Sequence, residues 1–288
     1  MSQWHYGGQA LLEGVMIRGR SAMAIAVRNP QGEIVLHDER LPDTGKSWKK
    51  WPFLRGIFGL WDTLNLGMRA LNYSANVALG ESEYKVGPAQ MAGVVAVSVL
   101  FGIALFFVTP LLLVQLIRQL VLAPWLQVLL EGLVRLGIVL LYFIAVSQMR
   151  DIKRVFAYHG AEHKAVNALE AGATLDVAGV RPFATAHTRC GTAFLLLVVV
   201  LSIPLFAPLG GLPLGWRLLS RIVLVPLLAG VSYEVMRLAA AHFDRPVVRA
   251  LMAPALLLQR ISARPPDDGM IEVAIAALNR AVELDAAA

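Results

Sequence analysis

Charged residues are scarce in this chain. Only 16% of its 288 residues are charged, 57% are hydrophobic, and the mean hydropathy is +0.61. A soluble domain usually carries about 25% charged residues. Residues 86 to 117 form a long run without a single charged side chain. This scarcity excludes an ordinary soluble globular protein and predicts a polytopic membrane protein with modest soluble parts.

Cysteine is nearly absent, and a secretory signal is not recognisable. Cys190 is the single cysteine, which excludes a disulfide within the chain and favours a reducing environment for its segment. Residues 1 to 20 do not show a basic region followed by an apolar run and a cleavage site, so we expect no secretory signal. The chain also lacks internal repeats and low-complexity tracts. The apolar segments themselves are therefore the expected membrane anchors.

Acidic residues are fewer than basic ones. The chain has 26 Lys and Arg against 20 Asp and Glu, a formal net charge of +6. In a membrane protein this excess indicates cytoplasmic loops and contact with anionic lipid, so we expect no specific nucleic-acid partner. The segment from 150 to 189 is rich in basic residues: Arg150, Lys153, Arg154, Lys164, Arg181 and Arg189. The positive-inside rule then predicts a multi-pass protein of the inner cell membrane with both termini in the cytoplasm.

The apolar segments predict about four transmembrane helices. These cover about 89 to 110, 131 to 149, 191 to 208 and 216 to 238. Residues 111 to 130 are interpreted as an outer interfacial or re-entrant piece. Glu131 and Arg135 lie one helical turn apart, so we expect them to pair near the outer surface. We expect the second helix to continue without a break through residue 154.

The N-terminal third contains a predicted sheet and an amphipathic helix. Strands are expected at 22 to 28 and 33 to 37, joined by a turn at 29 to 32, within a small β unit. Residues 53 to 71 place apolar side chains at helical spacing, after Lys46, Lys49 and Lys50. We interpret this helix as lying in the membrane interface on anionic lipid, and a soluble core helix is the alternative.

A last helix is expected after the Pro-Pro-Asp-Asp sequence at 265 to 268, capped by Asp268. One of its faces is apolar and carries Ile271, Ile275, Leu278 and Val282. The predicted fold is therefore mainly α. Its expected parts are a cytoplasmic β unit (1–45), an interfacial helix (46–85), a four-helix membrane domain (86–240) with a metal-site loop at 150–190, and a cytoplasmic helical tail (241–288).

The most informative motif lies between Tyr158 and Lys164 and has the form His-x-x-Glu-His. On a helix, His159, Glu162 and His163 share one face. Two imidazoles one turn apart can bind one divalent metal, here expected to be Zn²⁺, while Glu162 acts on a bound water as general base. The structural alternative is a pair of surface histidines on a cytoplasmic helix.

A zinc hydrolase needs a third protein ligand and an open position for water. Four residues are candidates: Glu170, His187, Cys190 and Glu234. The second, third and fourth spans return to one membrane level, so His187, Cys190 and Glu234 can converge on the histidine pair. Glu234 can instead pair with Arg237, and Cys190 can be a small buried hydrophobe.

Glu13 and Arg18 are the notable polar residues of the β unit. They are candidates for binding substrate at the edge of the site. The alternative is a solvated strand edge, which natural sheets commonly furnish with charged side chains.

Five stretches have a recognisable pattern: Gly7 to Gly19, Tyr158 to Lys164, His187 to Gly191, Ser232 to Glu234, and the tail from Pro254 to Leu278. Together they resemble the bacterial YqhQ-like family over nearly the whole chain. The resemblance implies a membrane domain of unknown function, usually described as a predicted metal-dependent enzyme, with metal at His159 and His163. One departure is Thr188, where the family pattern has proline. It leaves His187 and Cys190 in place.

Three functions follow as hypotheses. The leading one is a membrane-embedded, metal-dependent hydrolase that faces the cytoplasm and acts on a peptide or lipid-linked substrate. The second is a non-catalytic membrane assembly or scaffold factor whose polar cluster is structural. The third is a small transporter, against which the few charges inside the spans argue.

Overall fold

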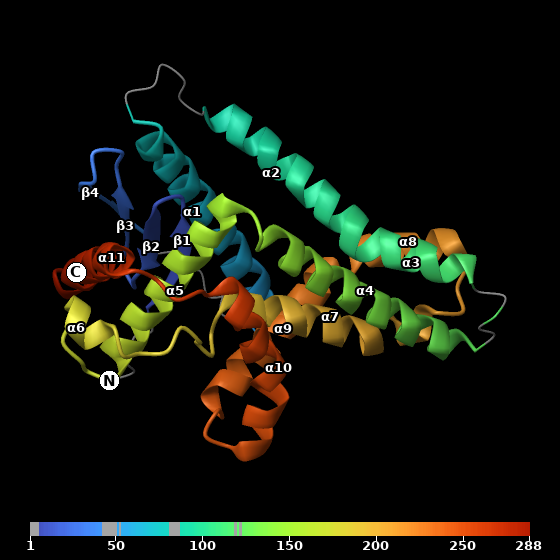
Figure 1. Cartoon of the computed structure of the whole chain (residues 1–288). Helices are drawn as coiled ribbons and strands as arrows, with labels where there is room; N and C mark the ends of the chain where they lie inside the picture. The colour runs from blue at the N-terminus through green and yellow to red at the C-terminus, as the bar shows by residue number, and fades with distance from the viewer. Residues whose placement is uncertain (1–5, 42–50, 52, 81–86, 118–119, 121–122) are drawn as a thin grey trace.

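The computed structural model describes residues 6–41, 51, 53–80, 87–117, 120 and 123–288. A small sheet lies at one end of the molecule among three helices, and long apolar helices extend away from it (Figure 1). The prediction of a mainly helical protein with a small N-terminal sheet is confirmed. The Lys46, Lys49 and Lys50 cluster falls outside the described residues.

The sheet is an antiparallel meander in the order β1-β2-β3-β4. Its strands are β1 (Gly7–Leu11), β2 (Gly14–Arg18), β3 (Ala22–Arg28) and β4 (Ile34–Arg40). The expected turn at 29 to 32 joins β3 to β4, where the Asn29 amide donates to Glu33 O at 2.9 Å. Gly32 has φ +89°, a conformation that favours glycine.

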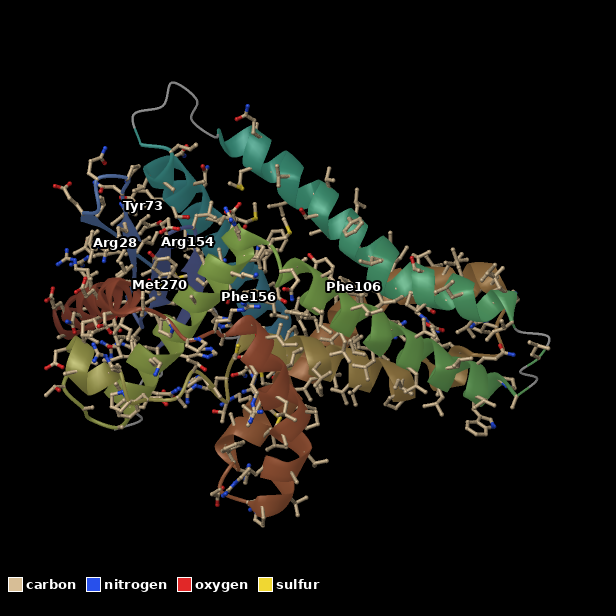
Figure 2. The ribbon with its side chains drawn as sticks, in the orientation of Figure 1. Arg28, Tyr73, Phe106, Arg154, Phe156 and Met270 are labelled. Carbon is tan, nitrogen blue, oxygen red and sulfur yellow. The ribbon has the colours of Figure 1, made fainter. Side chains whose placement is uncertain are left out.

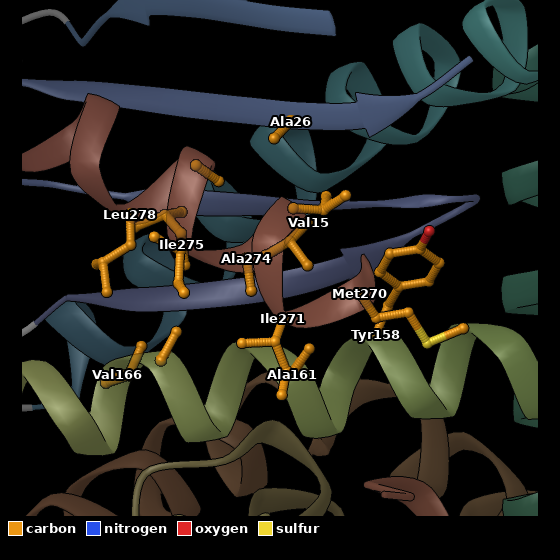
Figure 3. Packing of buried hydrophobic residues seen from close by; sticks show 14 of the residues in the cluster. Val15, Ala26, Tyr158, Ala161, Val166, Met270, Ile271, Ala274, Ile275 and Leu278 are labelled. Atoms are coloured by element: carbon orange, nitrogen blue, oxygen red, sulfur yellow. The ribbon is translucent and has the colours of Figure 1, made fainter. Parts of the chain in front are cut away.

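Both faces of β2 and β3 are buried, which explains why these strands alternate only weakly in the sequence. Val15 and Ile17 point to one face and Met16 to the other. The first face packs against α5 (Arg150–Glu170) and α11 (Asp268–Ala286), and Figure 3 shows Ile271, Ala274 and Leu278 of α11 in this core. The second face packs against α1 (Leu54–Ala78). The N-terminal strands and the C-terminal helix thus share one hydrophobic core.

The apolar face predicted for the last helix is confirmed, since Ile271, Ile275 and Leu278 are buried. Its predicted cap is wrong. Asp267 is extended at the N-cap and accepts from Met270 N at 2.8 Å, whereas Asp268 is already helical and its carboxylate pairs with Arg181. The cap falls one residue earlier because only the residue before the first turn can turn its side chain back on the free amides.

The second half of α1 is a core helix, as in the alternative interpretation. Leu66 and Ala70 are buried against the sheet, and Gly67 lies against the side chain of Gln9. In the first half, Trp61 and Leu64 are exposed, while Gly56 contacts Tyr233 of α9 (Val225–Ala241). The helix therefore links the sheet to the apolar bundle. Its contact with a membrane interface stays a prediction.

Three helices are long and apolar enough to cross a membrane: Ala89–Leu116, Pro124–Val146 and Gly191–Leu209. A fourth candidate is the pair Leu214–Val223 and Val225–Ala241, which is bent by 50°. The elements are α2 (Pro88–Ile103), the π-helix η2 (Ala104–Val108), α3 (Thr109–Leu116), α4 (Pro124–Val146), α7 (Gly191–Phe206), η4 (Ala207–Leu209) and α8 (Leu214–Val223), followed by α9. Within the described residues, the number of candidate spans agrees with the predicted four if the bent pair is counted as one span.

The first two candidate spans differ in extent from the prediction. The described part of 111 to 130 forms the ends of two long helices rather than a separate re-entrant piece. Pro110 does not end the first helix. Having no N–H, it cannot bond to the carbonyl of Phe106, which instead accepts from Arg135 Nε at 2.8 Å. The helix can therefore continue past the proline, because a side chain from another helix bonds to the carbonyl that the proline leaves free.

The expected pairing of Glu131 with Arg135 is present at 2.7 Å, but the pair is not isolated. Arg221 of α8 donates twice to Glu131, at 2.7 Å each, and Arg217 lies 3.7 Å from it. All four side chains are at most 2% exposed. Glu131, Arg135, Arg217 and Arg221 therefore form one buried charged cluster that joins α4 to α8.

The expected continuity of α4 and α5 is wrong. The chain leaves the helix at Ser147 and starts a new helix at Arg150. The Ser147 hydroxyl donates to Ile144 O at 2.8 Å, and its own carbonyl accepts from Arg264 at 3.0 Å. These bonds satisfy a helix end that would otherwise leave polar groups unpaired. The break lets α5 leave the bundle and pack on the sheet.

Candidate metal centre

Helix α5 carries the His-x-x-Glu-His motif between the sheet and the last turn of α10 (Pro246–Ser262). Small residues give α5 its close contacts: Ala157, Ala161, Ala165 and Ala168 are buried in the core that it shares with the sheet and α11. At Gly160, an added Cβ would lie 1.9 Å from the carbonyl oxygen of Arg264. Only glycine therefore permits the chain after α10 to cross α5 beside His159.

The two histidines of the motif face each other, with ring centroids 4.3 Å apart. His159 Nδ1 lies 2.7 Å from Ser262 O, and His163 Nδ1 lies 2.5 Å from Thr185 O. A carbonyl only accepts, so each Nδ1 must carry a proton, and in the neutral imidazole each Nε2 then keeps a lone pair. This arrangement, with backbone carbonyls fixing the tautomer, is typical of metal-ligating histidines.

Cys190 offers a third atom that could bind a metal ion. Its Sγ lies 3.3 Å from His159 Nε2, and the three ligand atoms of His159, His163 and Cys190 all lie within 4.8 Å of one another. Cys190 is also the N-cap of α7, where Thr192 N approaches Sγ at 3.4 Å. The thiolate is the metal-binding form of cysteine. Two imidazoles and a thiolate form a donor set suited to zinc.

Glu162 lies beside this group rather than in it. Its side chain is 6% exposed, and Oε2 lies 3.6 Å from His163 Nε2. Gly8 of β1 covers the carboxylate, since a Cβ on that glycine would lie 2.6 Å from Glu162 Cγ. The strand backbone thus confines a buried acid next to the group of candidate ligand atoms.

His187 lies next to the group, its ring centroid 5.6 Å from that of His163. Gln259 of α10 fixes its backbone: the amide of His187 donates to Oε1 at 2.8 Å, and Nε2 of Gln259 donates to the His187 carbonyl at 2.9 Å. Burial lowers the pKa of His187, so its imidazole is neutral. The Nε2 atom of His187 is buried and has no hydrogen bond to any described residue.

The two acidic candidates for third ligand are held elsewhere. Glu234 binds Arg55 of α1, with Arg55 Nε donating at 2.6 Å, and it also accepts from Phe53 N at 3.2 Å. Glu170 pairs with Arg189 and lies 3.6 Å from His187 Nε2. Within the described residues, neither carboxylate belongs to the group of close ligand atoms.

Glu13 occupies the turn between β1 and β2 with φ +52°. Arg154 of α5 donates to its carboxylate twice, at 2.5 Å each, and Tyr158 donates at 3.3 Å. Figure 2 shows Arg154 beside the sheet. The Arg154 hydrogen bond is the main cause that lowers the pKa of Glu13. Arg18 ends β2 opposite Gly7 of β1. Glu13 thus joins the sheet to the helix of the motif.

Several residues that shape the site have no signal in the sequence. Thr185 and Ser262 act through backbone carbonyls, which every residue possesses. Gln259 acts through a side-chain amide on a different helix. Gly8 is the exception, because a glycine inside a strand often marks a close backbone approach.

Fold and site together define a class: a mainly helical protein with apolar helices of membrane-spanning length and a buried His-His-Cys group at their end. The family model described as "Protein of unknown function (DUF1385)" matches residues 51–284, and the chain belongs to this family. It is similar to "Uncharacterized protein YqhQ" of Bacillus subtilis (strain 168), with 32% identity over 300 residues, covering 98% of this chain and 93% of the relative. No solved structure matches. The family resemblance is confirmed, and neither comparison assigns an activity.

Proposed function

We propose that this protein is a metal-dependent hydrolase embedded in the inner membrane, with its site facing the cytoplasm. The observation that supports this most directly is the orientation of three ligand atoms. His159 Nε2, His163 Nε2 and Cys190 Sγ point to one place, and each Nδ1 is anchored to a carbonyl. A carboxylate lies next to this place without belonging to the group.

The donor set suits Zn²⁺, which takes two imidazoles and a thiolate and leaves a fourth position open in catalytic sites. When bound, such an ion activates water for attack at neutral pH. Glu162 would accept the proton at Oε2 and pass it to the leaving group. Gly8 and the buried surroundings would keep the carboxylate in place. Hydrolysis of a peptide or a lipid-linked substrate is the reaction class we propose.

The location supports a substrate that reaches the site at the membrane surface. Cys190 caps α7, one of the candidate spans, so the ligand group lies at the end of an apolar helix. The sheet, α5 and α11 lie at this same end (Figure 1). The excess of Lys and Arg in residues 150 to 189 favours the cytoplasmic side.

A structural metal site is the second candidate, and His187 favours it. Its buried Nε2 has no hydrogen bond among the described residues, and its ring is next to that of His163. If His187 joined the group as a ligand, it would fill the fourth position and close the site to water. A closed shell of four protein ligands belongs to structural zinc.

One set of variants separates the two functions. His159→Ala and His163→Ala should each remove bound metal. Glu162→Gln keeps the size of the side chain but abolishes the carboxylate base, so it should retain metal and thermal stability yet lose function. The measurements are metal content, thermal unfolding and complementation of a deletion strain. Glu272→Gln, an exposed acid on α11, is the control.

Full complementation by Glu162→Gln at native expression level would refute the hydrolase. X-ray absorption on the zinc-loaded protein adds an independent result. Three protein ligands with one light-atom ligand agree with the proposal, whereas loss of one nitrogen ligand in His187→Ala indicates the structural site.

A further inference from the structure

Helix α10 exposes several large apolar side chains. Its inner face, with Met252, Ala255 and Leu258, is buried, as expected of a helix packed on its neighbours. At exposed positions of the same helix, however, the apolar residues Val247, Leu251 and Leu257 are 68%, 75% and 54% exposed. A helix at a water-facing surface carries polar residues there. Between Pro246 and Ser262 the sequence has no acidic residue.

The orientation of α10 fits a membrane interface. Figure 1 shows it running across the direction of α4 and α7, at the junction between the sheet region and the apolar bundle. Arg249 and Arg260 of the same helix are also exposed. A helix that lies in the interface plane has this distribution, with apolar side chains in the acyl region and arginines at headgroup level.

A cleft of about 510 Å³ lies between α7, α9 and α10. Apolar side chains of all three helices line it, among them Leu196, Val200, Ala239 and Leu251. Its volume falls within the range of ligand sites, which are mostly apolar with a few polar groups. Leu238, which also lines the cleft, is 64% exposed, so the lining is continuous with the outer apolar surface.

The polar groups of the cleft are basic. His242 and Arg245 contribute to its lining, at the turn between α9 and α10. His242 Nδ1 donates to Leu238 O at 3.0 Å, which leaves Nε2 available. The guanidinium of Arg245 is exposed, and no described carboxylate forms an ion pair with it. A cation beside an apolar cleft is complementary to an anionic headgroup attached to an acyl chain.

We propose that this cleft binds one anionic phospholipid of the cytoplasmic leaflet. An acyl chain lies along Leu196, Val200 and Leu251, and the phosphate contacts Arg245 and His242 Nε2. The inference rests on the proposed membrane location and is independent of the metal chemistry. The positive charge of the cleft favours an anionic lipid over a second copy of the chain. A second copy would bring the same basic turn to the cleft, and like charges repel.

The test is native mass spectrometry of the full chain released from detergent, titrated with dioleoylphosphatidylglycerol or dioleoylphosphatidylcholine. We expect the wild type to retain phosphatidylglycerol, the anionic lipid, in preference to phosphatidylcholine. Val200→Trp fills the cleft and should lose the bound lipid, whereas Leu195→Trp, on the outward side of α7, should retain it. If Val200→Trp is unstable, Ala239→Phe fills the same cleft from α9.

Arg245→Gln should lower the preference for phosphatidylglycerol about fivefold, the effect of one interfacial arginine. Arg260→Gln, also exposed on α10 but outside the cleft, is its control. His159→Ala should leave lipid binding unchanged, so failure of the metal site and failure of this proposal are distinguishable. Equal lipid retention by Val200→Trp and Leu195→Trp would overturn the proposal. A dimer that Val200→Trp dissociates, without bound lipid in the wild type, would overturn it as well.

Discussion

A histidine can bind a metal only through the nitrogen that its other hydrogen bonds leave open. In this protein two backbone carbonyls settle that choice for His159 and His163, and both imidazoles present Nε2 to Cys190. Glu162 is confined by the backbone of β1 at Gly8. The chemistry of the site thus depends on residues whose side chains take no part in it.

Gly8→Ala tests the contact between the strand and the carboxylate. The new Cβ would lie 2.6 Å from Glu162 Cγ and 2.8 Å from Met16 O, so the side chain or the strand must shift. We expect loss of complementation, retention of metal, and destabilisation of on the order of 1–3 kcal/mol, as for an overpacked core. Gly7→Ala is the matched control, because nothing lies within 4 Å of its added Cβ. Wild-type behaviour of both variants would contradict the close contact.

At the scale of elements, α5 is held from three sides. Arg154 and Tyr158 bond to the β1–β2 turn through Glu13, Arg264 O lies against Gly160, and Lys164 donates to the carbonyls of Arg181 and Phe183. Because the helix breaks after Ser147, α5 can run in a different direction from α4. The helix of the motif is therefore positioned by the sheet and the loops rather than by the apolar bundle.

The ion pair of Glu13 predicts a pH dependence of stability. Hydrogen bonding from Arg154 is the main cause that lowers the pKa of this carboxyl in the folded protein. A lowered folded pKa contributes stability above the unfolded pKa, and this contribution is lost as pH falls through the folded pKa. Glu13→Gln should therefore have a lower melting temperature than the wild type at pH 7. The difference between the two melting temperatures should narrow below about pH 4.3.

Thermal unfolding of both proteins in detergent from pH 3 to 7 measures this difference. Glu33→Gln is the control, because its carboxylate accepts from the Asn29 side-chain amide rather than from a cation. If the difference in melting temperature between Glu13→Gln and the wild type stays constant down to pH 3, the ion pair contributes nothing to stability.

At the scale of the whole molecule, the two ends of the chain meet. Asp285 of α11 accepts from the amides of Arg20 and Ser21, at 2.7 Å each, in the turn between β2 and β3. The N-terminal sheet and the C-terminal helix consequently lie on the same side of the apolar bundle. An even number of spans is consistent with this arrangement, and the described residues provide four candidates if the bent pair α8–α9 is counted as one span.

The predicted topology can be tested by labelling with a membrane-impermeant maleimide in intact cells. In a Cys190→Ser background, Ala171→Cys at the end of α5 should be protected, and Gly211→Cys at the opposite end of the bundle should react. Both positions are exposed in the structure. Detergent lysis is the control and should make both reactive. Labelling of Ala171→Cys from outside intact cells would place the metal centre on the wrong side for our proposal.

Part of this architecture could be predicted from the sequence because it depends on local patterns. Charge scarcity and apolar run length located four candidate spans, and 3.6-residue spacing placed Ile271, Ile275 and Leu278 on one buried face. The same periodicity put His159, Glu162 and His163 on one side of a helix. Helix boundaries were less accurate, because Arg135 and Arg264 satisfy carbonyls from far along the chain.

The tertiary structure alone decided which residue joins the histidine pair. The sequence left Glu170 open by its spacing from His163 on one helix, and His187, Cys190 and Glu234 by their approximate depth in the membrane. Packing brings Arg55 to Glu234 and Arg189 to Glu170, so those carboxylates have cationic partners, and it turns the N-terminus of α7 toward His159. Spacing along one helix fixes only which side chains share a face. The segment that meets this face is selected by contacts distributed over the whole chain.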